Sequence, residues 1–160
     1  MDWIFKIIEY IGKLLIRRKE EQERQKIAEE KKNKDDARIA IIIYENITGI
    51  ENYIKHNHSS DNMYISSNWE KSLEKCDFLT PKERELVRKI YIEAKNFHDN
   101  WAKRNEDGIY RSKADVPSYQ ELQKFFFERY YDNIYNTDKH TKEYDNLLKK
   151  LEKYIPENKD

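Results

Sequence analysis

The sequence predicts an all-α protein, in which a long N-terminal helix, amphipathic and then charged, is followed by a small bundle of about four helices. Helix breakers are scarce, because the 160 residues include only three Gly and three Pro. Charged residues make up 39% of the chain and the mean hydropathy is −1.11, so the apolar residues must be gathered in stripes. Those apolar residues recur at spacings of three and four, which is the period of a helix.

Residues 1–16 are the first predicted element, an amphipathic helix that seeks a membrane or a partner. A narrow polar strip holds Asp2, Lys6, Glu9 and Lys13, and Arg17 continues it. Apolar side chains cover the rest of the circumference, namely Trp3, Ile4, Phe5, Ile7, Ile8, Ile11, Leu14, Leu15 and Ile16. We expect this helix to bury its apolar face in a bilayer interface, a partner protein or an oligomer. The expected binding residues are Trp3, Ile4, Phe5, Ile8, Ile11, Leu15, Arg17 and Arg18.

Residues 17–38 are predicted to form a charged helical stalk. Opposite charges stand four residues apart at Glu20 and Arg24, and again at Lys26 and Glu30. Each such pair adds a few tenths of a kcal/mol to an exposed helix. Because the segment has almost no apolar positions to bury, disorder with partial helicity is the alternative.

Residues 39–155 are expected to form the bundle, beginning with a helix whose apolar stripe is Ile39, Ile43, Ile47, Ile50 and Ile54. The β-branched block at residues 41–44 could form a strand, but the longer stripe favours a helix. If this helix fuses with the two preceding segments, residues 2–56 form one helix about 80 Å long.

Two further helices are expected between residues 69 and 104. A short one carries Trp69, Leu73 and Cys76. The sequence Thr80-Pro81-Lys82-Glu83 then supplies an N-cap, a first-turn proline and the acid of a capping box, so a helix begins at Pro81. Its predicted buried face consists of Leu86, Val87, Ile90, Tyr91, Ala94, Phe97 and Trp101.

A loop over residues 105–116 and two more helices complete the prediction. Ser118 and Glu121 suggest a second capping box. The helix that they begin is apolar nearly all round, with Tyr119, Leu122, Phe125, Phe126, Phe127, Tyr130, Tyr131, Ile134 and Tyr135. A last helix from about Asp138 to Tyr154 buries Tyr144, Leu147, Leu148 and Leu151, and residues 156–160 form a polar tail.

Composition and motifs argue against several classes of function. The 31 basic and 31 acidic residues balance, whereas a nucleic-acid binder gathers a basic face, so no nucleic-acid partner is expected. A single cysteine, Cys76, excludes an intramolecular disulfide and suggests a reducing compartment. His56, His58 and Asp61 lack the fourth ligand of a structural zinc site. We therefore expect a protein without catalytic, metal or cofactor sites, which acts by binding.

Three functions fit the N-terminal helix. In the first, the protein is peripheral at the cytoplasmic face of the cell membrane, with Arg17, Arg18 and Lys19 against anionic lipid. In the second, several copies assemble into a membrane-perturbing or pore-type effector of a bacterial defence or phage system, although residues 2–16 span only about 22 Å. In the third, the chain is a soluble scaffold or adaptor whose helix lies in a protein interface. The width of the apolar face favours the first.

Overall fold

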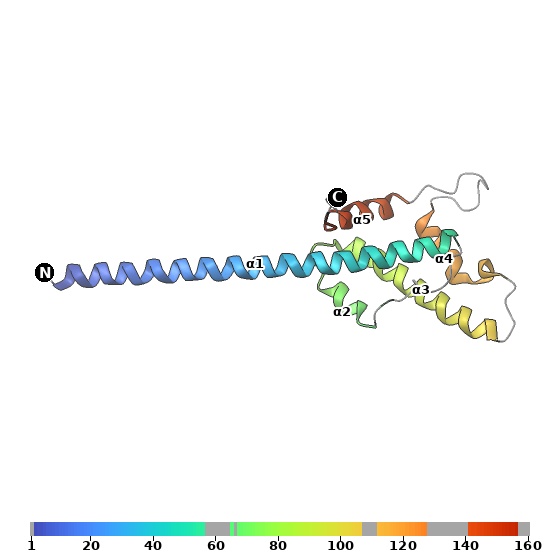
Figure 1. Cartoon of the computed structure of the whole chain (residues 1–160), viewed down its shortest axis with the longest axis horizontal. Helices are drawn as coiled ribbons and strands as arrows, with labels where there is room; N and C mark the ends of the chain where they lie inside the picture. Colours follow the sequence, from blue (N-terminus) through green and yellow to red (C-terminus); the bar gives the residue numbers. More distant parts are fainter. Residues whose placement is uncertain (1, 57–64, 66, 107–111, 128–140, 157–160) are drawn as a thin grey trace. The chain divides into compact units, whose positions relative to one another are not determined.

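The computed structural model describes residues 2–56, 65, 67–106, 112–127 and 141–156, and the regular structure in these ranges is helical throughout. The elements are α1 (Asp2–His56), α2 (Trp69–Glu74), α3 (Pro81–Glu106), the 3-10 turn η2 (Lys113–Asp115), α4 (Pro117–Phe126) and α5 (Lys142–Glu152). The predicted fold class is confirmed: a long N-terminal helix precedes a small helical bundle (Figure 1).

Helix α1 is unbroken from Asp2 to His56 (Figure 1). The amphipathic segment, the charged segment and the isoleucine stripe are therefore one helix, as expected if they fused. The helix predicted at residues 41–44 is confirmed over the alternative of a strand. The chain divides into two units, Met1–Ala37 and Arg38–Asp160. In the first unit, the residues from Trp3 to Asp35 are exposed, apart from Gly12, which is half-buried.

The core of the second unit forms around the isoleucine stripe of α1. Ile43, Ile47, Ile50 and Ile54 are buried, and Ile39 is partly buried against the same core. Contacts with α3 and α4 hold this part of α1. The Asn46 side-chain amide donates to the Tyr91 hydroxyl at 3.2 Å, and the Tyr119 hydroxyl donates to the carbonyl oxygen of Ile54 at 3.1 Å. The rings of Tyr53 and Phe97 lie 5.8 Å apart. Periodicity thus identified the correct face of α1.

Helix α3 begins at Pro81, as predicted. The Thr80 backbone N–H donates to Glu83 Oε2 at 2.7 Å, and the Glu83 backbone N–H donates to Thr80 Oγ1 at 3.2 Å. This reciprocal pair is a capping box. Most of the predicted face is buried (Val87, Ile90, Tyr91, Ala94 and Phe97), whereas Leu86 and Trp101 are partly buried.

Helix α2 is shorter than expected, because it ends at Glu74. Trp69 and Leu73 lie within it, but Cys76 follows its end. The Cys76 backbone N–H donates to the carbonyl oxygen of Leu73, and its thiol lies 3.2 Å from the carbonyl oxygen of Ser72. Cys76 is buried with its thiol free of a disulfide.

The capping box predicted at Ser118 is wrong. Helix α4 begins at Pro117, its N-cap is Val116 in an extended conformation, and no side chain caps it. Proline suits the first helical position, because its φ is already helical and it lacks the N–H that would be unpaired there. Ser118 therefore lies inside the first turn, where its hydroxyl is buried and makes no hydrogen bond with the residues that the structure describes.

The aromatic helix is also shorter than predicted. Helix α4 ends at Phe126, and Phe127 is extended with φ −126° and ψ 131°. The other predicted members, Tyr130, Tyr131, Ile134 and Tyr135, lie outside the described residues. Tyr119, Leu122 and Phe126 are buried in the core as expected.

The connection before α4 and the last helix complete the unit. Helix α3 continues to Glu106, so the predicted loop begins later than expected, and Lys113–Asp115 form the turn η2. Helix α5 begins after its N-cap Thr141, and the predicted start near residue 138 lies outside the described residues. Tyr144, Leu147 and Leu151 are buried, which confirms most of the predicted face of this helix.

Candidate membrane-binding helix

Residues 3–16 of α1, here called the apolar section, expose large apolar side chains that together form one surface on the helix. Trp3, Phe5, Ile8 and Leu15 are 61–72% exposed, and Ile4 and Ile11 are 45% and 49% exposed. Arg17 and Arg18 follow them and are also exposed. All eight residues predicted to bind therefore lie on the surface of one helix within about four turns. Sequence reasoning left out Tyr10, which is 64% exposed and extends the apolar surface.

The apolar surface occupies most of the circumference of the apolar section. At 3.6 residues per turn, the side chains from Tyr10 round to Ile16 cover an arc of about 240°. The polar strip fills the remainder with Lys6, Glu9 and Lys13. Lys13 Nζ lies 2.7 Å from Glu9 Oε1, so these two charges pair within the helix. The section therefore presents a wide apolar face and a narrow, nearly neutral strip.

Basic residues mark the end of the apolar section. Arg17, Arg18 and Lys19 are consecutive and exposed, and successive helical residues point about 100° apart. Their side chains therefore spread around the helix rather than forming one face. Beyond them the charges mix, and a shallow hollow between exposed side chains of the same helix is lined by Arg17, Glu20, Glu21, Arg24, Gln25 and Ala28.

The described residues contain neither a membrane-spanning helix nor a metal-binding cluster. None of the helices in the described ranges has the length and apolar character required to traverse a bilayer. Within those ranges, no group of three His, Cys, Asp or Glu side chains is placed to hold a metal ion. Of the residues His56, His58 and Asp61 considered above, His58 and Asp61 lie outside the described residues. His98 is exposed beside Asp99, 3.6 Å away.

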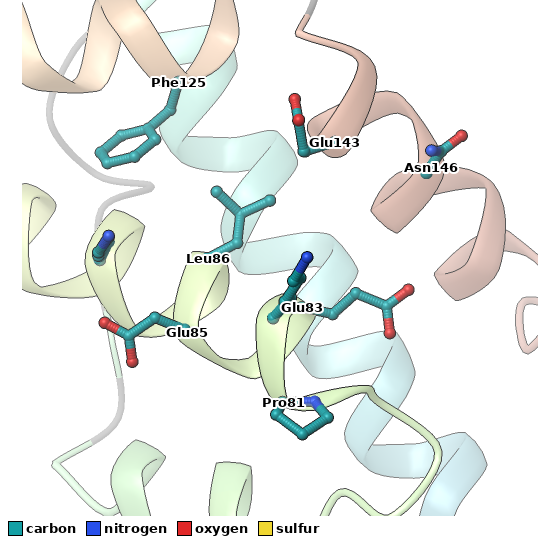
Figure 2. A pocket seen from close by; sticks show the side chains of 9 residues that line it. Pro81, Glu83, Glu85, Leu86, Phe125, Glu143 and Asn146 are labelled. Atoms are coloured by element: carbon teal, nitrogen blue, oxygen red, sulfur yellow. The ribbon is translucent and has the colours of Figure 1, made fainter.

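An open groove of about 550 Å³ lies in the second unit. It is lined by Pro81, Lys82, Glu83, Glu85, Leu86, Lys89, Phe125, Glu143 and Asn146. Leu86 of α3 and Phe125 of α4 turn their side chains toward this space, and α5 contributes Glu143 and Asn146 (Figure 2). The groove has the size of a small-ligand site, but its rim carries both signs of charge and does not indicate one class of ligand.

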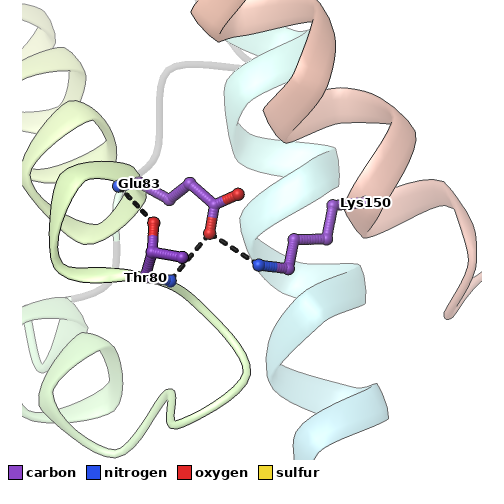
Figure 3. Close-up of polar contacts among 3 residues, drawn as sticks. All are labelled: Thr80, Glu83 and Lys150. Atoms are coloured by element: carbon purple, nitrogen blue, oxygen red, sulfur yellow. Dashed lines mark hydrogen bonds and ion pairs between the residues drawn. The ribbon is translucent and has the colours of Figure 1, made fainter.

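A contact beside the groove joins α5 to the start of α3. Lys150 Nζ lies 2.7 Å from Glu83 Oε2, the same oxygen that accepts from the Thr80 backbone N–H (Figure 3). Partial burial alone would raise the pKa of Glu83, but the hydrogen bonds from Lys150 and Thr80 outweigh it and lower this pKa below its ordinary value. One carboxylate thus caps a helix and holds a second helix against it.

A buried carboxylate joins α1 to α5. Glu51 is only 6% exposed. The Tyr144 hydroxyl donates to Glu51 Oε2, and Lys55 Nζ lies 3.0 Å from Glu51 Oε1. Burial, and then the hydrogen bond and charge of Glu51, raise the pKa of Tyr144 far above its ordinary value. Sequence reasoning missed Glu51, although it stands four residues after Ile47 and three before Ile54, and so on the buried face.

The chain was also compared with known proteins. No protein-family model, curated protein or solved structure matches it. What the protein does must therefore be inferred from its own residues and their geometry.

Proposed function

We propose that this chain is a non-catalytic, membrane-associated protein, anchored by the apolar section of α1 and acting through lipid or protein contacts. The observation that carries the proposal is the exposure of ten large apolar side chains between Trp3 and Ile16. Large contiguous apolar surfaces mark protein or membrane interaction sites. A bilayer interface can accept an arc of about 240° because the acyl chains adapt to the helix.

The energy available from this surface is substantial. Full burial of one large apolar side chain is worth about 1.5–3 kcal/mol. If half of the ten side chains, each roughly half to two-thirds exposed, entered the acyl boundary, they would contribute on the order of 6 kcal/mol before the cost of association. That is enough to support reversible binding. Trp3 suits the headgroup level, and Arg17 and Arg18 would contact lipid phosphates.

The proposed location is the cytoplasmic face of the cell membrane. A single, buried cysteine suits a reducing compartment, and basic residues next to an apolar helix favour the anionic cytoplasmic leaflet. Two other functions would use the same residues. Several copies could assemble into a membrane-perturbing effector, or the apolar section could pack against a partner protein in a soluble scaffold.

Flotation with liposomes tests the proposal. The full chain and a variant lacking residues 1–16 are mixed with anionic or neutral vesicles that contain an entrapped dye. The proposal expects the full chain to float with the vesicles and the shortened variant to remain in solution. Thermal unfolding followed by circular dichroism checks that the shortened variant retains its folded bundle.

Each of the other outcomes has a defined meaning. Flotation with release of the dye favours the membrane-perturbing assembly. Failure of the full chain to float with either lipid overturns the membrane proposal. Loss of folding when residues 1–16 are removed identifies the apolar section as part of the protein's own core.

A further inference from the structure

The polar strip of the apolar section supplies little net charge to attract a membrane. Its two acids, Asp2 and Glu9, balance its two lysines, Lys6 and Lys13. Glu9 and Lys13 already pair with each other at 2.7 Å. Because long-range attraction to anionic lipid scales with net positive charge, the strip itself adds almost nothing to it. The excess positive charge lies at one end, at Arg17, Arg18 and Lys19.

The apolar arc, in contrast, is wide and bulky. Trp3 and Phe5 are 65% and 72% exposed, and Ile and Leu side chains fill most of the remaining arc. A helix with an apolar arc of about 240° buries its apolar area only if it sinks deep between the headgroups. The lipids must then move apart, and they do so most easily where curvature already leaves gaps between headgroups.

We infer that the apolar section selects membranes by lipid packing more than by charge, binding strongly curved bilayers in preference to flat ones. The inference rests on the proposed membrane function and names the lipid surface that it takes. The neutral strip and the bulky arc act together. The strip adds no net charge to that of Arg17, Arg18 and Lys19, and the arc makes insertion sensitive to the space between lipids. A Lys-rich strip on the same helix would instead follow the surface charge of the membrane.

The test uses the full chain with small sonicated and large extruded vesicles of the same neutral lipid, and with a parallel set of anionic vesicles, at low and high salt. We expect binding per accessible lipid to be about tenfold stronger on small vesicles, with less than about twofold change between the two salt concentrations. Equal binding to both sizes overturns the inference and leaves the membrane function standing. Binding only to anionic vesicles, abolished by high salt, also overturns the inference and leaves the membrane function standing. Binding to no vesicle overturns both.

A charge variant provides the converse test. Glu9→Lys removes the pair with Lys13 and raises the net charge of the strip by two while leaving the apolar arc intact. We expect the variant to bind large anionic vesicles at least about tenfold more tightly than the natural chain, and to lose that gain at high salt. If the substitution leaves both the affinity for anionic vesicles and its salt dependence unchanged, the neutral strip does not set lipid preference and the inference is wrong.

Discussion

Ile8 and Ile27 offer a matched pair of substitutions for the membrane proposal. Both are isoleucines on α1, and they are 61% and 62% exposed. Ile8 lies within the apolar section, whereas Ile27 stands alone among charged residues. Changing either one to Gln keeps a residue with good helix propensity and removes nearly the same exposed apolar surface. The two variants therefore differ only in where that surface lies.

The magnitude follows from the exposed fraction of Ile8. Full burial of Ile is worth about 1.5–3 kcal/mol, so three-fifths of that surface corresponds to about 1–2 kcal/mol. At about 1.4 kcal/mol per factor of ten, Ile8→Gln should weaken vesicle binding roughly 5- to 30-fold. Ile27→Gln should change it less than about twofold, because the surface lost does not enter the bilayer.

The assay is the bound fraction of protein measured against lipid concentration, for the natural chain and both variants. Thermal unfolding should be nearly unchanged in all three proteins, since both side chains are exposed. Equal weakening by the two substitutions would refute the reasoning, because the apolar section would then have no special role. So would a variant at Ile8 that binds as well as the natural chain.

Three further predictions concern the bundle and are measured by urea unfolding. Thr80→Ala removes the N-cap of α3 and should lower the free energy of unfolding by about 1 kcal/mol; an unchanged value would contradict the capping role. The pKa of Glu83 is lower in the folded protein, so its carboxylate stabilises the fold above the ordinary glutamate pKa, and this contribution disappears as the pH falls toward the folded pKa. Glu83→Gln should therefore lose less stability on acidification than the natural chain, and an identical pH profile would count against the contact. Tyr144→Phe removes one hydrogen-bond donor to buried Glu51 and should lower the free energy of unfolding by about 1–3 kcal/mol. Tyr44→Phe loses only a 3.4 Å contact with exposed Glu152 and should lower it by less than about 0.5 kcal/mol. Equal losses of stability in the two variants would refute this reasoning.

Features encoded over a few residues could be predicted from the sequence. Thr80-Pro81-Lys82-Glu83 contains every group that its capping box uses, so the start of α3 required no knowledge of the rest of the chain. The isoleucine stripe of α1 likewise repeats over about four turns, long enough to outweigh the strand preference of residues 41–44. Local signals of this kind are sufficient when nothing competes with them.

Where two local signals compete, the sequence was misleading. Ser118 and Glu121 have the spacing of a capping box, but Pro117 directly before them is better suited to open the helix. The resulting shift by two positions buried the Ser118 hydroxyl. The end of α4 at Phe126 was missed for a related reason, since the apolar residues continue beyond it without a Gly or Pro to signal the end.

Contacts between distant residues could not be predicted at all. Glu51 and Tyr144 are hydrogen-bonded although they lie 93 residues apart in the sequence. A charged residue on an apolar face signals only that some partner must exist. Which helix supplies the partner depends on the packing of α1 against α5. The exposed apolar side chains of the apolar section were predicted, apart from Tyr10, because their pattern depends on no other part of the chain.

The central claim is that the apolar section lies in a bilayer interface, and Trp3 reports on it directly. The chain has three tryptophans, and the other two, Trp69 and Trp101, are partly buried in the second unit against Tyr91 and Phe97. The measurement is quenching of tryptophan fluorescence by lipids brominated at shallow or deep positions of the acyl chain, for the natural chain and for Trp3→Phe. We predict quenching that is strongest with shallow bromines and absent in the variant. Emission unaffected by brominated vesicles, or equal quenching in both proteins, would contradict the claim.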